Sequence, residues 1–382
     1  MLKLNVIGCG AAGNKAAIEL IEKNFQGRVT LVNSTFRDIP EKYKNNAVIF
    51  GASNESLGGC GKERTVGKKL ILKDLQSGNI NIDQYIDPDT NVVVLVSSTE
   101  GGSGSAVTPI LAEYISKVLG IPVIICLFFG FNTDVRGMQN SIEICQELTE
   151  DYGVVGISNA AFLDEANGNK LKAEHLANEE FCNIVRILTG QDIHPGSQNI
   201  DDTDLYKLVV TNGYMFVGST SLKGVKNMEM FNKVITNAMD DSKLMQSGKK
   251  SAKRIGGIFT IPEEMSDFID INLDVMTQRY GIPYEMFTHV QTTVEGQNPT
   301  MSWIVSGMDL PIDEVKEIYE NYKKASESVN KSKDSFFDTI GKFNGNNADT
   351  MFNMLDNARP TSRNNAKATN NFFAKYGMTD KK

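Results

Sequence analysis

Three short glycine-rich stretches of the chain have the residue types and spacing to bind a phosphate group through backbone amides. The first, Gly8-Cys9-Gly10-Ala11-Ala12-Gly13, follows the pattern G-x-G-x-x-G between an apolar run and a helical pattern. The second, Glu100-Gly101-Gly102-Ser103-Gly104-Ser105-Ala106, adds two hydroxyl donors, and the third covers residues 57–63. Amides at the start of a helix attract anions. Two such loops therefore favour a nucleotide site over a plain glycine turn, which remains the alternative at each loop.

Two familiar nucleotide-binding patterns are not met. A Rossmann dinucleotide site, such as that of an NAD-dependent enzyme, needs an acidic residue about 20 residues after the glycines. Here the second predicted strand ends in Asn33-Ser34, so this alternative rests on the first glycine loop alone. A P-loop needs G-x-x-x-x-G-K-[ST], but Gly61-Lys62 is followed by Glu63, and Ser56 stands where the first glycine should be. A P-loop NTPase is excluded.

A polar loop at residues 195–204 carries groups that could act on water. It contains Asn199, Asp201 and Asp204. Two carboxylates can accept hydrogen bonds from an attacking water and help to hold a cation-bound water. The alternative is structural, with Asp202 or Thr203 capping a helix that begins near Asp204.

A sheet is needed to bring the glycine loops together. Over about the first 160 residues, apolar runs alternate with helical patterns; the runs lie near residues 2–7, 29–32, 47–50, 92–96, 122–128 and 154–157. The continuous run at 92–96 is typical of a strand buried on both faces. This alternation predicts an α/β fold with a doubly wound parallel sheet and its ligand loops at the carboxyl ends of the strands.

After residue 169 the order of predicted helices and strands is different. A long helix is expected at 170–188, followed by a smaller α+β domain with strands at 256–261, 285–290 and 301–305 around a helix near 265–280. A charged helix is expected at 314–328, and after it a flexible tail. We therefore expect four parts: a nucleotide-binding domain at 1–169, a central helix and polar loop at 170–203, the α+β domain at 204–307, and a helix plus tail at 308–382.

Composition supports a globular protein of two to three domains. The 382 residues are 41% apolar and 23% charged, which are ordinary values. The net charge of -8 argues against a surface that coats nucleic acid or an anionic membrane. Residues 341–382 differ, with seven basic and three acidic side chains and a net charge of +4.

The five cysteines favour a reducing compartment. Their number is odd and they never form C-x-x-C, so neither a disulfide framework nor a zinc site is supported, and no metal ligands are predicted. The first residues lack the pattern of a signal peptide, and the longest apolar run, at 121–131, is too short to span a bilayer. The expectation is a cytoplasmic protein.

Taken together, these residues resemble the tubulin/FtsZ superfamily. The second glycine loop is similar to its signature G-G-G-T-G-[ST]-G, with Glu100, Ser103 and Ala106 in place of the first glycine, the threonine and the last glycine. The resemblance implies a tubulin-like fold that binds GTP or GDP, with Mg2+ held mainly through the nucleotide. It assigns to nucleotide binding Gly10, Ala11, Ala12, Gly13, Asn14, Asn33, Gly59, Cys60, Gly61, Glu100, Gly101, Gly102, Ser103, Gly104, Ser105, Asp134, Asn159 and Asn178.

Within this set the resemblance implies separate roles. The loop at 57–67 would sense the terminal phosphate, Asp134 would contact the ribose, and Asn159 and Asn178 would read guanine, whose edge suits an amide side chain. The sequence departs from the family at Glu174, where an aromatic residue usually stacks on the base. The stacking partner therefore stays open.

The polar loop resembles the family's N-x-D-x-x-D loop. This likeness implies that Asn199, Asp201 and Asp204 are catalytic and that they complete the site of the next subunit, so that GTP is hydrolysed in head-to-tail filaments. A contact of this heterologous kind builds an open filament.

The tail narrows the resemblance further. Its basic, aromatic residues near 370–377 are more similar to TubZ-type tubulins, which segregate plasmid or phage DNA through a DNA-bound adaptor, than to division proteins of the FtsZ type. We therefore expect a DNA-segregation GTPase that binds itself and such an adaptor, with no direct membrane contact. The alternatives are an FtsZ-like cell-division GTPase, a NAD-dependent Rossmann enzyme, and a solvated tail that has no partner.

Overall fold

The computed structural model describes residues 1–52, 59–148, 151–246, 252–337, 371–372 and 374–378. Its strands are β1 Leu4–Cys9, β2 Val29–Asn33, β3 Ala47–Ile49, β4 Val92–Ser98, β5 Val123–Phe129, β6 Gly153–Ser158, β7 Gly213–Ser221, β8 Arg254–Ile261, β9 Glu285–Thr292 and β10 Thr300–Met308. Its α-helices are α1 Gly10–Glu22, α2 Arg64–Ser77, α3 Ser103–Glu113, α4 Val135–Glu147, α5 Lys170–Thr189, α6 Asp202–Val209, α7 Met228–Asp240, α8 Asp274–Tyr280 and α9 Ile312–Phe337.

Short helical turns complete the chain. Four are 3-10 turns, η1 Glu41–Asn46, η2 Ile82–Tyr85, η4 Ala160–Phe162 and η5 Glu263–Met265. The fifth, η3 Tyr114–Leu119, is a π-helix that continues directly from α3.

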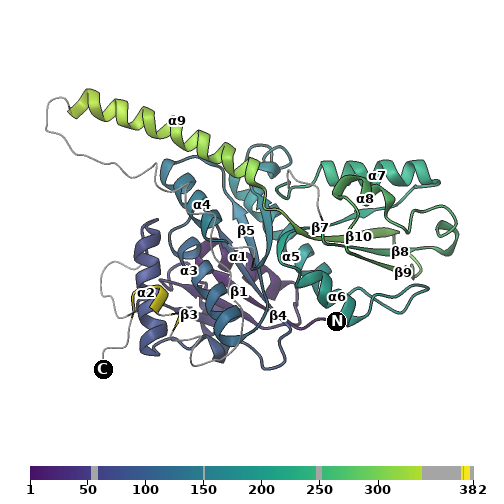
Figure 1. Cartoon of the computed structure of the whole chain (residues 1–382), viewed down its shortest axis with the longest axis horizontal. Helices are drawn as coiled ribbons and strands as arrows, with labels where there is room; N and C mark the ends of the chain where they lie inside the picture. The colour runs from purple at the N-terminus through teal and green to yellow at the C-terminus, as the bar shows by residue number, and fades with distance from the viewer. Residues whose placement is uncertain (53–58, 149–150, 247–251, 338–370, 373, 379–382) are drawn as a thin grey trace.

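The strands form one sheet in the order β3-β2-β1-β4-β5-β6-β7-β10-β8-β9 (Figure 1). β1 to β7 pair in parallel, and the chain order reverses where β1 pairs with β2 on one side and with β4 on the other. In such a sheet, ligands bind beyond the carboxyl ends of the strands at this reversal. The prediction of a doubly wound parallel sheet is confirmed.

The centre of the sheet is apolar on both faces. Every residue of β1 and β5, and all of β4 except Ser98, is buried. The continuous apolar runs in the sequence match this burial because helices cover both faces of a parallel sheet. The core thus holds rigidly the strands whose ends carry the glycine loops.

The second half of the chain extends the same sheet. β6 and β7 pair through Gly153 with Gly213 and Val154 with Tyr214, and β10 then runs antiparallel to both β7 and β8. α5 lies between the two halves in Figure 1, and α9 packs against α4 and extends beyond it. Since the sheet is continuous, the predicted domain boundaries stay a prediction.

One predicted helix is wrong. Instead of a helix over 265–280, the chain forms the turn Glu263–Met265 and then α8 from Asp274 to Tyr280. The Asp270 carboxylate accepts hydrogen bonds from the backbone N-H groups of Asn272 and Asp274. Such local bonds compete with helix formation. β7 and α7 were not predicted as separate elements.

Two further features concern the cysteines and the apolar character of the helices. All five cysteines are free, and burial raises the pKa of the thiols of Cys9, Cys126, Cys145 and Cys182 to about 12. Among the residues described, no helix has the length and apolar character to cross a membrane.

Candidate nucleotide site

The first and second glycine loops meet at the carboxyl ends of β1 and β4. Gly10 begins α1 with a φ of +73°, and a Cβ added there would lie 2.6 Å from the backbone nitrogen of Gly104. A Cβ on Gly104 would in turn strike the carbonyl oxygen of Cys9. Only glycine allows this approach. The amino ends of α1 and α3, which favour anions, therefore lie side by side.

Gly101 lies beside open space in the second loop. A Cβ added at Gly101 would meet no heavy atom within 4 Å, and its φ is outside the left-handed region. Gly102 differs, because a Cβ there would lie 2.6 Å from the Cα of Lys62. Among the glycines that the structure describes, Gly101 alone combines open space with an ordinary φ. The space fits a ligand group held on backbone amides.

The loop after β2 reaches the second glycine loop through a serine pair. The hydroxyl oxygens of Ser34 and Ser103 lie 2.8 Å apart. Asn33 instead shapes its own loop, since its Oδ1 accepts from the Ser34 N-H and its Nδ2 donates to Asp38 at 3.2 Å. The Ser105 hydroxyl donates to the carbonyl of Gly101. Ser103 is thus better placed than Ser105 to offer a hydroxyl to a ligand.

Two buried asparagines donate hydrogen bonds to backbone carbonyls of the strands and loops around the site. Asn14 is fully buried, its Nδ2 donates to the Val32 carbonyl at 3.4 Å, and its Oδ1 has no hydrogen-bond partner. Asn140 is also fully buried, and its Nδ2 donates to the carbonyls of Lys62 at 3.1 Å and Glu100 at 3.0 Å. Asn140 therefore ties the third loop to the second. The sequence analysis missed it, because nothing marks it within the helical pattern.

Three residues of the third loop have a left-handed backbone conformation. Gly59, Gly61 and Lys62 have φ values of +89°, +55° and +63°, and Cβ atoms at the two glycines would meet nothing within 4 Å. Cys60 between them is buried. Gly59 and Gly61 therefore face open space, whereas Cys60 does not, and residues 57 and 58 lie outside the described part of the chain.

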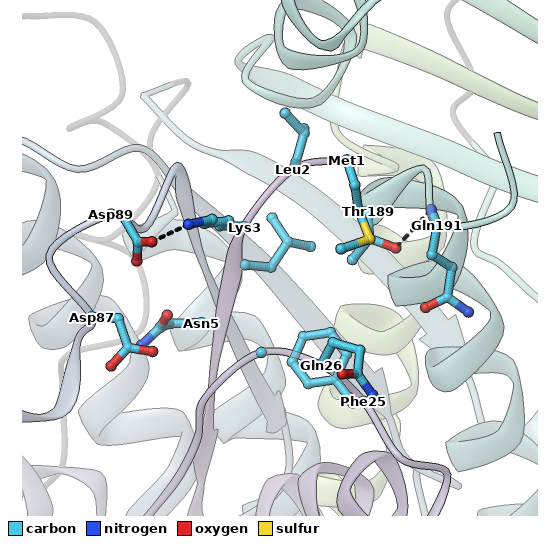
Figure 2. Close-up of a pocket in the computed structure, with 12 residues that line it drawn as sticks. Met1, Leu2, Lys3, Asn5, Phe25, Gln26, Asp87, Asp89, Thr189 and Gln191 are labelled. Atoms are coloured by element: carbon cyan, nitrogen blue, oxygen red, sulfur yellow. Dashed lines mark hydrogen bonds and ion pairs between the residues drawn. The ribbon is translucent and has the colours of Figure 1, made fainter. Parts of the chain in front are cut away.

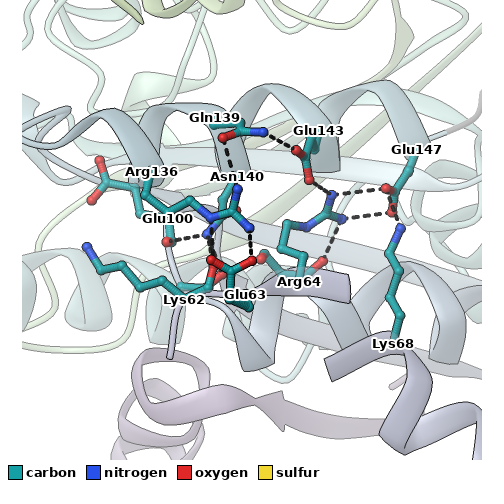
Figure 3. A network of polar contacts seen from close by, with 12 residues as sticks. Lys62, Glu63, Arg64, Lys68, Glu100, Arg136, Gln139, Asn140, Glu143 and Glu147 are labelled. Atoms are coloured by element: carbon teal, nitrogen blue, oxygen red, sulfur yellow. Dashed lines mark hydrogen bonds and ion pairs between the residues drawn. The ribbon is translucent and has the colours of Figure 1, made fainter. Parts of the chain in front are cut away.

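A network of ion pairs fixes the end of the third loop (Figure 3). The Arg64 side chain is only 1% exposed and donates to Glu143 at 3.0 Å, to Glu147 at 2.8 Å and to the Ser105 carbonyl at 3.0 Å. Lys68 also pairs with Glu147. The guanidinium group suits this task because its donors form a planar fork. α2, α3 and α4 are thereby joined behind the glycine loops.

Glu100 turns its carboxylate away from the glycine amides. Its Oε1 accepts from the Asn132 N-H at 2.8 Å, and a Cβ on Gly130 would collide with the carboxylate. Burial raises the pKa of Glu100. Its backbone N-H donates to the Ser98 hydroxyl at 3.3 Å, and its carbonyl accepts from Asn140. The backbone of Glu100 thus stabilises the second loop, while its carboxylate contacts the neighbouring loop that contains Asn132.

Asp134 has a structural role in the same region. Its Oδ1 accepts from the Gly137 N-H at 2.8 Å as the N-cap of α4, and its Oδ2 binds the Lys62 ammonium at 2.6 Å. The hydrogen bond from Lys62 holds the pKa of Asp134 below its usual value. Its side chain is still 41% exposed. Its ribose contact stays a prediction.

The two asparagines expected to read the base lie just after β6 and on α5. Asn159 directly follows β6, is 8% exposed, and has an Oδ1 with no hydrogen-bond partner. Asn178 is half-buried on α5. A cavity of about 320 Å³ opens at the carboxyl ends of β5 and β6, and its lining includes Gly130, Asn132 and Ser158 together with residues of α9.

A charged cluster beside Asn178 was missed. The ligand atoms of Glu19, His175 and Glu179 all lie within 4.8 Å of one another. The Lys23 ammonium lies 3.3 Å from Glu19 and 3.7 Å from Glu179, so a cation already balances these carboxylates. The spacing of His175 and Glu179, one helical turn apart, was the available signal.

The polar loop is held rigidly by its own side chains. The Asn199 amide bonds both backbone groups of Gly196, and Asp201 accepts from the Asp204 N-H at 2.8 Å. Asp201 is thus the N-cap of α6, which begins at Asp202. The alternative in which Asp202 or Thr203 caps the helix is wrong, since Asp202 instead pairs with the amino group of Met1.

The polar loop and the glycine loops lie at opposite ends of β1. The contact with Met1 places Asp202 at the amino end of the strand, whereas the glycine loop follows its carboxyl end. At about 3.3 Å per residue, the six residues of β1 alone separate the two by about 20 Å. A cavity of about 250 Å³ at the amino end is lined by residues 1–5 with Asp87, Asp89 and others (Figure 2). Within one chain, the two predicted halves of the site are not brought together.

Comparison with known proteins agrees with this geometry. Residues 3–167 match the model of the Tubulin/FtsZ family, GTPase domain. The chain is 25% identical over 215 residues to cell division protein FtsZ 1 of Methanocaldococcus jannaschii, covering 55% of this chain and 57% of that protein. It is 20% identical over 271 residues to FtsZ of Aquifex aeolicus, covering 69% and 72%. The chain spans little more than half the length of the first of these relatives.

Solved structures show the same fold at low identity. A GTPγS-form protofilament of Bacillus thuringiensis serovar israelensis TubZ gives a TM-score of 0.69 at 13% identity, covering 87% of this chain and 94% of that chain. GDP-bound CetZ1 of Haloferax volcanii gives 0.65 at 19%, covering 86% and 99%. Residues 3–167 of this chain therefore resemble the GTPase domain of the Tubulin/FtsZ family, and the solved structures show a tubulin-like fold.

Proposed function

We propose that the protein hydrolyses GTP in head-to-tail filaments, in which the polar loop of one subunit completes the nucleotide site of the next. The observation that carries this proposal is the placement of the glycine loops and of the Asp201 carboxylate at opposite ends of β1. Groups this far apart cannot act on one ligand within one chain. They can meet when the carboxyl edge of one sheet faces the amino edge of another.

The glycine loops would hold the phosphates of GTP. The amides at the amino ends of α1 and α3, the open space at Gly101 and the Ser103 hydroxyl fit an anionic group. Bound GTP supplies the phosphoanhydride bond that water attacks and carries Mg2+ with it. Asn14 and Asn140 position the loops, while Asn159 and Asn178 remain our candidates for reading the base. The match to the family model, together with similar solved structures described with GDP and GTPγS, supports this choice of nucleotide.

Asp201 and Asp204 would act on the attacking water of the neighbouring subunit. Both belong to a loop that is fixed at Gly196, where the Ser197 N-H also donates to the Val290 carbonyl of β9 at 2.8 Å. The Asp201 carboxylate accepts a hydrogen bond from the Asp204 N-H through Oδ1, so it can orient water without first having to be ordered. Asn199 acts as a positioning residue, because its amide is used to close the loop.

The test replaces each carboxylate by an amide. Asp201→Asn keeps a good helix cap, and Asp204→Asn does not touch the cap. Both should bind GTP as the wild type does and should form persistent filaments, while turnover falls at least about 100-fold. The matched control is Asp202→Asn in the same loop, which should turn over normally. Normal turnover in Asp204→Asn and Asp201→Asn would remove the catalytic role.

The cellular role that we propose is segregation of plasmid or phage DNA through an adaptor bound to that DNA. The likeness to TubZ structures and the basic tail support it. An FtsZ-like division role is the second candidate, because the curated relatives reported above are cell division proteins. Purification of the filaments from cells separates the two: enrichment of one defined DNA segment supports segregation, and enrichment of membrane supports division.

A further inference from the structure

The end of the chain returns to the GTPase domain. Of the segment 371–378, the structure describes all but residue 373. Phe372 is only 3% exposed, and its ring meets that of Tyr114 edge-on, with centroids 5.7 Å apart and planes at 74°. The Phe372 ring also meets that of Tyr376, with centroids 5.4 Å apart. A phenylalanine this deeply buried is part of the packed structure rather than of a solvated tail.

Polar contacts join the same two surfaces. The Lys375 ammonium lies 2.9 Å from both carboxylate oxygens of Glu113, and the Tyr376 hydroxyl donates to Glu113 Oε2 at 2.9 Å. The Glu113 side chain is 17% exposed. Burial and the nearby Glu113 charge raise the pKa of Tyr376. One carboxylate is thus the shared partner of two tail residues, at the edge of an aromatic cluster.

The surface has an unusual backbone. Glu113 is the last residue of α3 and Tyr114 the first of the π-helix η3, so both lie where the helix widens. Single π-helical turns inside helices often mark functional sites. The same helix begins at Ser103 in the second glycine loop, about 15 Å from Glu113 at 1.5 Å per residue. In Figure 1 the yellow segment is drawn beside α2, the helix that packs against α3.

We propose that residues 371–378 are a peptide ligand of the α3–η3 surface, and that the chain holds its own segment there as a latch. The latch occupies Phe372 and Tyr376, so a partner that binds these two side chains must displace it. The latch itself does not depend on GTP hydrolysis. Its consequence for a DNA-bound adaptor rests on the proposed function.

The segment could in principle belong to a neighbouring copy. Residues 338–370 separate it from α9, and a chain of that length can extend up to about 110 Å. The proposal commits to docking within one chain, because that is the arrangement in the structure. The experiment must therefore distinguish the two.

The first test is photochemical cross-linking of the full chain with p-benzoylphenylalanine in place of Phe372. Equal amounts of protein with natural nitrogen and with nitrogen-15 are mixed before irradiation. The expected product joins position 372 to the peptide containing Glu113 and Tyr114, with both halves carrying the same isotope. Products that mix the isotopes, or a cross-link elsewhere, would overturn the latch.

The second test is amide hydrogen exchange in Phe372→Ala and Glu113→Ala. Each should speed exchange in residues 374–378 by about tenfold or more, since a buried ring or a shared carboxylate is lost. Tyr284→Ala, which removes an aromatic side chain that is 87% exposed, is the matched control and should change nothing there. GTP turnover of Phe372→Ala is measured in parallel and should equal that of the wild type. Unchanged exchange in both latch variants refutes the latch whatever the GTPase result.

Discussion

At the scale of single residues, the glycines carry the most information. Their spacing in the sequence was enough to predict two loops that bind an anion, because only glycine permits such backbone. The sequence could not show that Gly10 packs on Gly104, since this contact joins loops more than 90 residues apart. Nor could it separate Gly101, which faces open space, from Gly102, which packs on Lys62.

This difference predicts the effect of an added methyl group at Gly101. Gly101→Ala should leave the melting temperature unchanged, because a Cβ fits there and the φ is ordinary. It should weaken GTP binding about tenfold or more, because the methyl group would occupy the space of the ligand. Titration with a fluorescent GTP analogue measures the affinity. Gly102→Ala, which must displace the Lys62 backbone, should instead lower the melting temperature. Wild-type affinity in Gly101→Ala would place the nucleotide elsewhere.

A pH dependence follows from Glu100. Burial raises the pKa of its carboxyl in the folded protein, so the unfolded chain, with a pKa near the ordinary value of about 4.3, loses the proton first. Stability contributed at this site is therefore present below that pH and is lost as the pH rises through the folded pKa. Glu100→Gln removes this pH-dependent loss of stability and keeps a side-chain oxygen that can accept from the Asn132 N-H.

The measurement is the melting temperature of Glu100→Gln and of the wild type between pH 4.5 and pH 8. The difference between variant and wild type should become more positive as the pH rises. A constant difference would mean that the Glu100 carboxyl titrates in the folded protein as it does in water.

At the scale of elements, the sequence predicted the strands better than the links between helices. Continuous apolar runs identify β1, β4 and β5 because burial on both faces leaves no polar position. Arg64 could not be assigned in this way, since its partners Glu143 and Glu147 lie about 80 residues away on α4. The helix predicted over 265–280 failed for a local reason, because the Asp270 side chain bonds the backbone and interrupts the helix.

The Arg64 network predicts a stability effect that is separate from nucleotide binding. Arg64→Ala leaves Glu143 and Glu147 without their buried cation and should lower the free energy of unfolding by about 2–4 kcal/mol. Arg64→Lys should have a free energy of unfolding between those of the wild type and Arg64→Ala, because lysine lacks the planar fork. Denaturant unfolding measures both, with Lys69→Ala, at an exposed position of the same helix, as the control. A loss no larger than that of the control would show that the network is not stabilising.

At the scale of the whole molecule, the structure shows where the basic end of the chain and the two halves of the proposed site lie. The net charge of -8 averages an acidic body and a basic end, and the described part of that end lies against Glu113. The sequence predicted a solvated or partner-bound tail. It could not predict the docking, because Lys375 and Glu113 are 262 residues apart. The separation of the glycine loops from Asp204 was implied by the resemblance alone, and the structure adds its size, because β1 lies between the two.

The most direct measurement of our central claim, that one subunit completes the nucleotide site of the next, is GTP turnover in a mixture of two impaired variants. Asp204→Asn retains its glycine loops, and Gly101→Ala retains its polar loop. At a GTP concentration too low to fill the Gly101→Ala site, each variant alone should be nearly inactive. The mixture should turn over GTP well above the sum of the two, because an Asp204→Asn subunit receives Asp204 from its Gly101→Ala neighbour. A mixture no more active than that sum would contradict catalysis between subunits.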